Sequence, residues 1–335
     1  MLDARTSRQI DERLNDLYRR HIPMEDVDVE TFYEPGRGYH KPEQAGDERH
    51  KFGISIADLD GGLHGVGDHD EPFAVQTISK VFVYCLAMAD RGSDRVLKRV
   101  GVEPSGDAFN SILLDERNSR PYNPMVNSGA IATTDMVRGR DPSEKVERIV
   151  EVMRLYAGNQ SLKVDQATFE REWASADRNR AIAYLMRSQG ALTGDVEETL
   201  SVYLQQCSIK VTCDDVARMA ATLANGGVNP VTGVCPLPAS RVRDVLSVMF
   251  TCGMYDFAGE WAFDVGVPAK SGVSGGILVA VPSKMGLATY SPGLDPYGNS
   301  VRGVGVCQEV SRRLGLHVFA GEHEDALLGS SAPAP

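Results

Sequence analysis

Residues 73–92 read FAVQTISKVFVYCLAMADRG, and this stretch decides the fold. Its apolar period and length predict a helix that ends at Gly92. At the start of that helix, Thr77 and Lys80 lie about 60° apart on one face, where the lysine can take the hydroxyl proton if burial keeps its amine neutral. The positive helix N-terminus favours an anionic oxygen at the same place. Taken alone, the pattern also fits an N-cap threonine followed by a surface lysine.

A second motif, Lys270-Ser271-Gly272, lies in the C-terminal part of the chain, where the pattern predicts strands. A Lys-Ser-Gly strand beside a hydroxyl-x-x-Lys helix is the pairing used by serine β-lactamases and penicillin-binding proteins. An edge strand can offer a backbone N–H to an oxyanion, and glycine allows a close approach. A loop beside a turn is the alternative for this motif alone. The order and separation of the two motifs together argue against chance.

The predicted elements come in blocks around these two motifs. Strands are expected at 52–67, 262–272, 275–284 and 285–292, and helices at 6–20, 77–92, 142–156, 179–190, 195–206, 213–226, 239–252 and 301–315. This order is not a βαβ repeat, so it predicts an α+β fold in which helices flank an antiparallel sheet and a helical part is inserted.

The chain is expected to divide into three parts. These are an N-terminal helix at 1–25, a main domain at 26–325 and a disordered, Pro-rich tail at 326–335. Within the main domain, we assign the sheet part to about 50–76 and 240–318, and the helical part to about 77–239.

Composition and charge limit the partners. The 335 residues carry a net charge of −11 and no basic block, which argues against binding to nucleic acid. No apolar run approaches the roughly 18 residues of a membrane span, and the charged N-terminus is not a secretory signal. The six cysteines form no CxxC pair and the seven histidines no HExxH motif. We therefore expect a cytoplasmic protein with no metal, no nucleic acid and no membrane partner.

Several polar residues between the two motifs are candidates for holding a ligand. Asn123 and Asn127 are four residues apart, and Glu172 and Asn179 are seven apart, which is two helical turns if the segment is continuous. Considered singly, each asparagine is most simply a cap or turn residue, and Glu172 a solvated surface carboxylate. The candidate ligand-holding residues also include three tyrosines, Tyr39, Tyr203 and Tyr255. Each of them, considered alone, is most simply an aromatic residue of the core or of its rim.

Long blocks of the chain resemble the serine-dependent glutaminase family, which has a β-lactamase/penicillin-binding-protein-like fold. The resemblance covers roughly residues 30–318. The blocks that carry it are FAVQTISKVF, RPYNPMVNSGAI, DRNRAIAYLM, CSIKVTCDDVARMAATLANGGVNPVTG, TCGMYDFAGEWAFDVGVPAKSGVSGGILVAVP and SPGLDPYGNSVRG. A chance match to all of them in this order is not credible.

The resemblance implies hydrolysis of L-glutamine to L-glutamate and ammonia through a covalent acyl-enzyme, with no cofactor and in a homodimer or homotetramer. It places the nucleophile at Thr77 and the catalytic lysine at Lys80. The implied substrate contacts are Tyr39, Asn127, Glu172, Asn179, Tyr203, Tyr255 and the backbone of Val273. Around Tyr39, the block GRGYHKPEQA departs from the family pattern by one extra residue.

The chemistry of free glutamine is consistent with this set. Its ammonium needs a carboxylate, for which Glu172 is the natural candidate. Its α-carboxylate needs neutral donors, which Asn127, Asn179 and a tyrosine hydroxyl can supply. The backbone N–H groups of residues 77 and 273 could form an oxyanion hole. The leaving ammonia needs a proton, and Tyr203 or Tyr255 could give it.

One departure concerns the nucleophile, because the family has a serine where this chain has Thr77. The added methyl group restricts χ1 and crowds the line of attack. Three outcomes follow: Thr77 acts as the nucleophile, Ser79 replaces it although it points about 100° away from Lys80, or the protein binds glutamine without turnover. A penicillin-interacting acyltransferase is a further hypothesis, and it rests on fold analogy alone.

Overall fold

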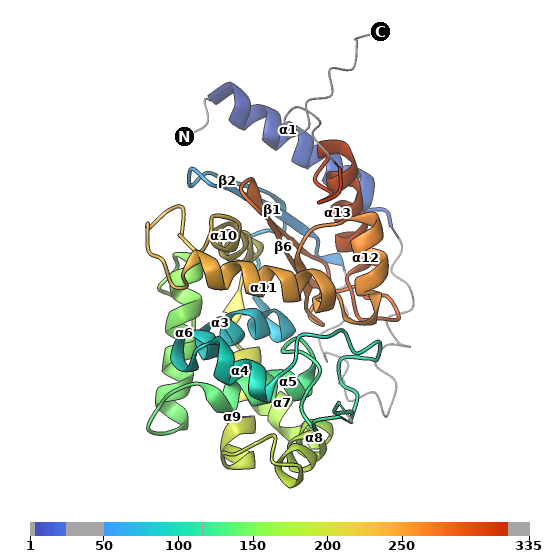
Figure 1. Cartoon of the computed structure of the whole chain (residues 1–335). Helices are drawn as coiled ribbons and strands as arrows, with labels where there is room; N and C mark the ends of the chain where they lie inside the picture. The colour runs from blue at the N-terminus through green and yellow to red at the C-terminus, as the bar shows by residue number, and fades with distance from the viewer. Residues whose placement is uncertain (1–3, 25–49, 116, 321–335) are drawn as a thin grey trace, which may run out of the picture.

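The computed structural model describes residues 4–24, 50–115 and 117–320. Its centre is an antiparallel sheet of five strands in the order β2-β1-β7-β6-β5 (Figure 1). The strands are β1 (Gly53–Asp58), β2 (Leu63–Gly67), β5 (Ala269–Ser271), β6 (Gly276–Val281) and β7 (Met285–Tyr290). Because β1 pairs with β7, the two ends of the chain build one sheet, and the helices between them form an insertion. The predicted α+β fold is confirmed.

Helices cover both faces of this sheet. The helices α1 (Ala4–His21) and α13 (Val301–Leu314) pack on one face, and α10 (Cys213–Ala224) packs on the other (Figure 1). Strand β6 is therefore buried on both sides, which explains why its sequence GILVAV is apolar throughout instead of alternating. Gly286 in β7 allows α10 to come close, since a Cβ at this position would lie 2.1 Å from the carbonyl oxygen of Ala217.

The remaining helices form a second body on the α10 side of the sheet (Figure 1). They are α3 (Ser79–Arg91), α4 (Ser93–Arg99), α5 (Asn127–Met136), α6 (Pro142–Ala157), α7 (Gln166–Ala174), α8 (Asp177–Ser188), α9 (Val196–Cys207) and α11 (Ala239–Cys252). The short helix α12 (Ala258–Asp264) lies on the other face of the sheet, where Trp261 packs in the same apolar cluster as residues of α1 and α13. The short strands β3 (Phe73–Ala74) and β4 (Lys210–Val211) pair beside the start of α3. Helix α3 is buried along nearly its whole length, so it is the central element to which the others attach.

The N-terminal helix α1 docks on the chain's own core. Leu14 and Leu17 are buried against the sheet, as the predicted apolar stripe requires. At the end of the helix, His21 Nε2 lies 2.8 Å from the carboxylate of Glu309 in α13. The opposite face of α1 is polar. Because the helix has one apolar and one polar face, it packs on the sheet although its sequence is rich in charged residues.

One prediction of local structure is wrong, and one condition set for the site residues is not met. Residues 262–272 do not form one strand, because the segment begins inside α12 and only Ala269–Ser271 is extended. A short run with mixed periodicity does not distinguish these two states. Glu172 and Asn179 do not share a helix either. The Ser175 hydroxyl donates to the Arg171 carbonyl at the end of α7, and a new helix begins at Asp177.

Several elements lie outside the predictions. Helices α4, α5 and α7 were not expected, since their apolar patterns are short. The N-cap Asp165 of α7 was a local signal that the prediction did not use. Tyr39 and the tail at 326–335 lie outside the described residues.

Candidate active site

Thr77 sits in a tight turn just before α3. The turn is a 3₁₀ segment, η2 (Gln76–Ile78), and Gln76 has a positive φ of 46°, which is strained for a residue with a side chain. The threonine is 4% exposed, and its Oγ1 donates to the carbonyl of Ser271 at 2.8 Å. Its Oγ1 also lies 2.6 Å from the hydroxyl oxygen of Tyr255. The hydroxyl of the first motif therefore contacts the backbone of the second motif.

Lys80 is completely buried one turn further along. Burial lowers the pKa of its ammonium to about 7, because a charged amine loses its hydration inside the protein. Its Nζ donates to Asn127 Oδ1 at 2.7 Å and to the Met125 carbonyl at 3.1 Å. Among the described residues, no carboxylate forms an ion pair with it. Thr77 and Lys80, both described, are not hydrogen-bonded to each other, so the expected direct contact is absent.

Tyr255 and Lys270 complete the buried polar centre. Tyr255 has a positive φ of 59°, and its hydroxyl lies 3.0 Å from the Ser271 carbonyl oxygen. Burial raises the pKa of this phenol, which keeps it protonated. Lys270 Nζ donates to the Ser271 carbonyl at 2.5 Å and lies 4.2 Å from the centre of the Tyr255 ring. Burial, followed by the nearby charge of Lys80, lowers the pKa of Lys270 well below its usual value.

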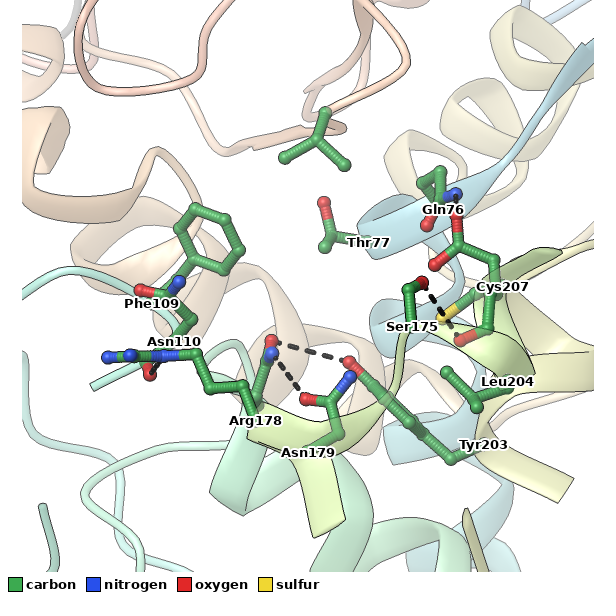
Figure 2. A pocket seen from close by; sticks show the side chains of 13 residues that line it. Gln76, Thr77, Phe109, Asn110, Ser175, Arg178, Asn179, Tyr203, Leu204 and Cys207 are labelled. Atoms are coloured by element: carbon green, nitrogen blue, oxygen red, sulfur yellow. Dashed lines mark hydrogen bonds between the residues drawn. The ribbon is translucent and has the colours of Figure 1, made fainter. Parts of the chain in front are cut away.

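Three of the predicted ligand-holding side chains form a connected group (Figure 2). Asn127 is the first residue of α5, Asn179 lies in the first turn of α8, and Tyr203 lies in α9. The amide of Asn127 donates to Asn179 Oδ1 at 2.9 Å, and the Tyr203 hydroxyl donates to Asn127 Oδ1 at 3.3 Å. The sequence suggested a cap or turn for each asparagine. That interpretation holds for Asn123, which bonds the backbone of its own turn, and it is wrong for Asn127.

These side chains line a pocket whose opposite wall carries a carboxylate. Glu172 Oε1 accepts a hydrogen bond from the amide of Gln76 at 2.9 Å. Glu172 is half-buried, so its interpretation as a solvated surface residue is wrong. The residues that line the pocket are Gln76, Thr77, Phe109, Asn110, Asn127, Glu172, Ser175, Arg178, Asn179, Tyr203, Leu204, Cys207 and Val273 (Figure 2).

Two backbone N–H groups at this pocket have no acceptor among the described residues. They belong to Thr77 and Val273, and within the described part of the chain neither donates to another residue. Val273 follows strand β5 in a turn, while Thr77 occupies the first turn before α3. Unpaired N–H groups from two different elements, converging on one pocket, can stabilise an oxyanion.

The structure brings together all the predicted site residues that it describes, and it adds others. Tyr255 and Lys80 lie behind the pocket wall, where Tyr255 is hydrogen-bonded to Thr77 and Lys80 to Asn127. The remaining ones line the pocket. Sequence reasoning missed Gln76, Phe109, Arg178 and the role of Lys270. Gln76 directly precedes the nucleophile position, and Lys270 belongs to the second motif, so these two had a local signal. Phe109 and Arg178 had none.

No metal centre is evident in the described ranges. Nowhere in residues 4–24, 50–115 and 117–320 do three His, Cys, Asp or Glu side chains gather in a way that could hold a metal ion. The expectation of a reaction without a metal or other cofactor stays a prediction.

Comparison with known proteins gives one consistent result. A family model described as glutaminase matches residues 40–319. The glutaminase of Trichormus variabilis is 51% identical over 306 residues, which cover 91% of this chain and 89% of that protein. A solved structure of a probable glutaminase matches with a TM-score of 0.86 at 36% identity, and covers 96% of this chain and 100% of its own. The probable glutaminase of Bacillus subtilis matches with a TM-score of 0.83 at 35% identity, over 93% and 98% of the two chains.

Proposed function

This chain belongs to the glutaminase family, and we infer from that membership and from its pocket that it hydrolyses L-glutamine to L-glutamate and ammonia. Its structural neighbours are glutaminases, which agrees with the β-lactamase-like fold. The observation that carries the assignment to this pocket is the position of Thr77. Its buried hydroxyl contacts Tyr255 and Ser271, one turn before a lysine whose pKa is near neutrality.

The first half of the proposed reaction forms a covalent acyl-enzyme. Thr77 Oγ1 attacks the carbon of the substrate's side-chain amide, and neutral Lys80 takes the hydroxyl proton. Because the two side chains, both described, are not hydrogen-bonded to each other in the free protein, this transfer requires Lys80 Nζ to turn from Asn127 toward Thr77 when substrate binds. The resulting oxyanion lies on the backbone N–H groups of Thr77 and Val273. The C–N bond then breaks, and ammonia leaves after it receives a proton from Tyr255.

Of the two tyrosines considered as proton donors, Tyr255 has the better geometry. Its hydroxyl lies 2.6 Å from Thr77 Oγ1, and its raised pKa keeps the proton available for donation. The Tyr203 hydroxyl donates to Asn127 and belongs to the substrate-holding group. In the second half of the reaction, water attacks the Thr77 ester, glutamate leaves, and the protons return to Thr77 and Tyr255.

The two charged ends of glutamine select different walls of the pocket. The half-buried carboxylate of Glu172 suits the ammonium, and in the free pocket it accepts a hydrogen bond from Gln76. Asn127, Asn179 and Tyr203 offer neutral donors to the α-carboxylate. Arg178 also lines the pocket, where its Nε donates to the Asn110 carbonyl.

Two alternatives have less support. The comparisons do not support a glutamine-binding protein without turnover, since relatives over most of the chain are named glutaminases. A penicillin-interacting acyltransferase had only fold analogy in its favour, and the solved structures of similar fold are glutaminases with 35–41% identity. No helix in the described ranges is long and apolar enough to cross a membrane. A cytoplasmic location and a homodimer or homotetramer remain part of the proposal.

The direct test measures ammonia release from L-glutamine by the wild type beside Thr77→Ala, Thr77→Ser and Lys80→Ala. Turnover is expected in the wild type and in Thr77→Ser, and its loss is expected in the other two. Ser79→Ala serves as the matched control, because it removes the neighbouring hydroxyl whose oxygen donates to the Gln76 carbonyl. Full activity in Thr77→Ala together with its loss in Ser79→Ala would move the nucleophile to Ser79.

A further inference from the structure

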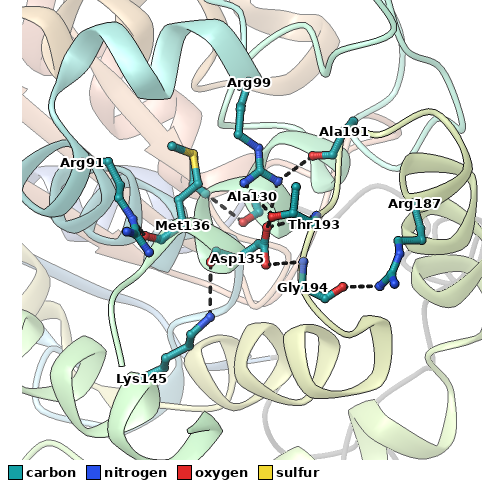
Figure 3. A network of polar contacts seen from close by, with 11 residues as sticks. Arg91, Arg99, Ala130, Asp135, Met136, Lys145, Arg187, Ala191, Thr193 and Gly194 are labelled. Atoms are coloured by element: carbon teal, nitrogen blue, oxygen red, sulfur yellow. Dashed lines mark hydrogen bonds and ion pairs between the residues drawn. The ribbon is translucent and has the colours of Figure 1, made fainter. Parts of the chain in front are cut away.

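A buried carboxylate lies at the end of α5 that is remote from the pocket (Figure 3). The Asp135 side chain is 3% exposed and accepts hydrogen bonds on both oxygens. Arg99 Nη2 donates to its Oδ2 at 2.7 Å, and the Thr193 hydroxyl donates to the same atom at 3.0 Å. The backbone N–H of Gly194 donates to Oδ1 at 3.0 Å. Asp135 therefore ties α4 and the loop at 189–195 to α5, and we call this set of contacts the Asp135 clasp.

The loop is shaped to fit this carboxylate. A Cβ at position 194 would lie 2.2 Å from Asp135 Oδ1, so only glycine lets the backbone approach. Arg99 reaches further and donates to the Ala191 carbonyl at 2.8 Å. Burial alone would raise the pKa of Asp135, but the hydrogen bond and charge of Arg99 lower it below the usual value. The carboxylate is thus ionised and fully hydrogen-bonded at neutral pH.

The clasp joins the same three helices that meet at the pocket. Helix α5 begins with Asn127 and carries Asp135 eight residues later, a distance of about 12 Å along its axis. The clasped loop is the connection from α8, which carries Asn179, to α9, which carries Tyr203. One end of this three-helix unit therefore holds the substrate-binding group, and the other end holds the clasp.

We propose that Asp135 is a positioning residue, which sets α8 and α9 against α5 so that Asn127, Asn179 and Tyr203 keep their mutual hydrogen bonds. The proposal rests on the function assigned to this pocket. A helix transmits an axial shift with little loss, and hydrogen bonds weaken steeply once their geometry is disturbed. The contact of Tyr203 with Asn127, at 3.3 Å, is already long. A shift of α9 by a fraction of an ångström would break it.

The test compares Asp135→Asn with the wild type in steady-state kinetics and in glutamate binding followed by thermal shift. The side-chain amide of the introduced asparagine has one acceptor oxygen. It cannot accept hydrogen bonds from all of Arg99, Thr193 and Gly194, so the loop at 189–195 must move. We expect KM for glutamine and Kd for glutamate to rise on the order of tenfold, with kcat changed less than threefold. The reason is that weaker hydrogen bonds to the substrate reduce binding in the ground state and the transition state alike.

The matched control is Asp215→Asn in α10. Asp215 is 4% exposed and, like Asp135, is a buried carboxylate held by hydrogen bonds, here from Thr212 and Asn159. Helix α10 carries no residue of the pocket. We expect an unchanged KM in this control. A wild-type KM and Kd in folded Asp135→Asn would overturn the proposal, while turnover by the wild type would leave the glutaminase assignment intact.

A second variant covers the case in which Asp135→Asn does not fold. Arg99→Lys keeps a cation beside Asp135 but loses the bond to the Ala191 carbonyl. A rise in KM with kcat retained supports the proposal. A lower melting temperature with unchanged KM contradicts it, because the clasp would then contribute only to stability.

Discussion

Replacing Lys80 by methionine is expected to remove turnover and to change how the stability of the protein depends on pH. The side chain is completely buried and makes no ion pair among the described residues, so the folded state disfavours its charged form. Burial lowers the pKa from 10.5 to about 7. Methionine has a similar length and no charge, which makes it a suitable apolar replacement.

The sign of the effect follows from proton binding. Below pH 7 the lysine is protonated in the folded and unfolded states, and folding carries the full cost of the buried charge. Between pH 7 and 10.5 the unfolded state binds more protons, so the free energy of unfolding rises with pH. The interval between those two pKa values corresponds to about 5 kcal/mol at 1.36 kcal/mol per pH unit, and about 2 kcal/mol of it falls between pH 7 and 9.

The assay is urea unfolding of the wild type and Lys80→Met at pH 7, 8 and 9. The stability advantage of the variant over the wild type is expected to shrink by about 2 kcal/mol across this range. The lost hydrogen bonds to Asn127 and Met125 shift the variant by a nearly constant amount and do not alter the slope. Lys270 is present in both proteins, so the part of its titration that burial sets cancels. The part that the charge of Lys80 sets belongs to the effect of removing Lys80. Parallel stability curves would refute the reasoning, since they would mean that folding leaves the lysine's pKa unchanged.

Three further predictions concern catalysis. In the wild type, kcat/KM is expected to rise about tenfold per pH unit below pH 7 and to level above it, because Lys80 must lose its proton; a flat profile between pH 5.5 and 9 would contradict this. Tyr255→Phe is expected to lower kcat by about a hundredfold while circular dichroism stays unchanged, and near-normal kcat would exclude Tyr255 as the proton donor. Glu172→Gln is expected to raise KM for glutamine by about tenfold or more and to keep kcat within a few-fold of the wild type. The reason is that a charge-assisted hydrogen bond to the substrate ammonium contributes about 1.5–3 kcal/mol. An unchanged KM would place the substrate ammonium elsewhere.

The order of the elements could be predicted from the sequence because its signals are local. The helices predicted at 142–156 and 213–226 correspond to α6 and α10. Pro142 stands in the first turn of α6 after the N-cap Asp141, and Thr212 forms a capping box with Asp215 at the start of α10. The hydroxyl-x-x-Lys and Lys-Ser-Gly motifs, with the long blocks that resemble glutaminases, pointed to residues that lie close together in the described chain, and their catalytic and binding roles stay predictions. The same local reasoning failed for residues 262–272, where helix and strand share one short pattern.

From the sequence alone follow the α+β order of the elements, the family, and part of the set of residues at the pocket. Only the tertiary structure decided which atoms touch. Thr77 contacts Tyr255 across 178 positions, and Lys80 contacts Asn127 instead of Thr77. Glu172 and Asn179 lie in two separate helices, α7 and α8, and not in one. Asp135 connects helices whose contact cannot be predicted from the spacing of residues in the sequence. The apolar period of a sequence shows which side of one helix or strand faces the core. Contacts between different elements depend on how those elements pack against each other. The same packing buries Lys80 and thereby lowers its pKa.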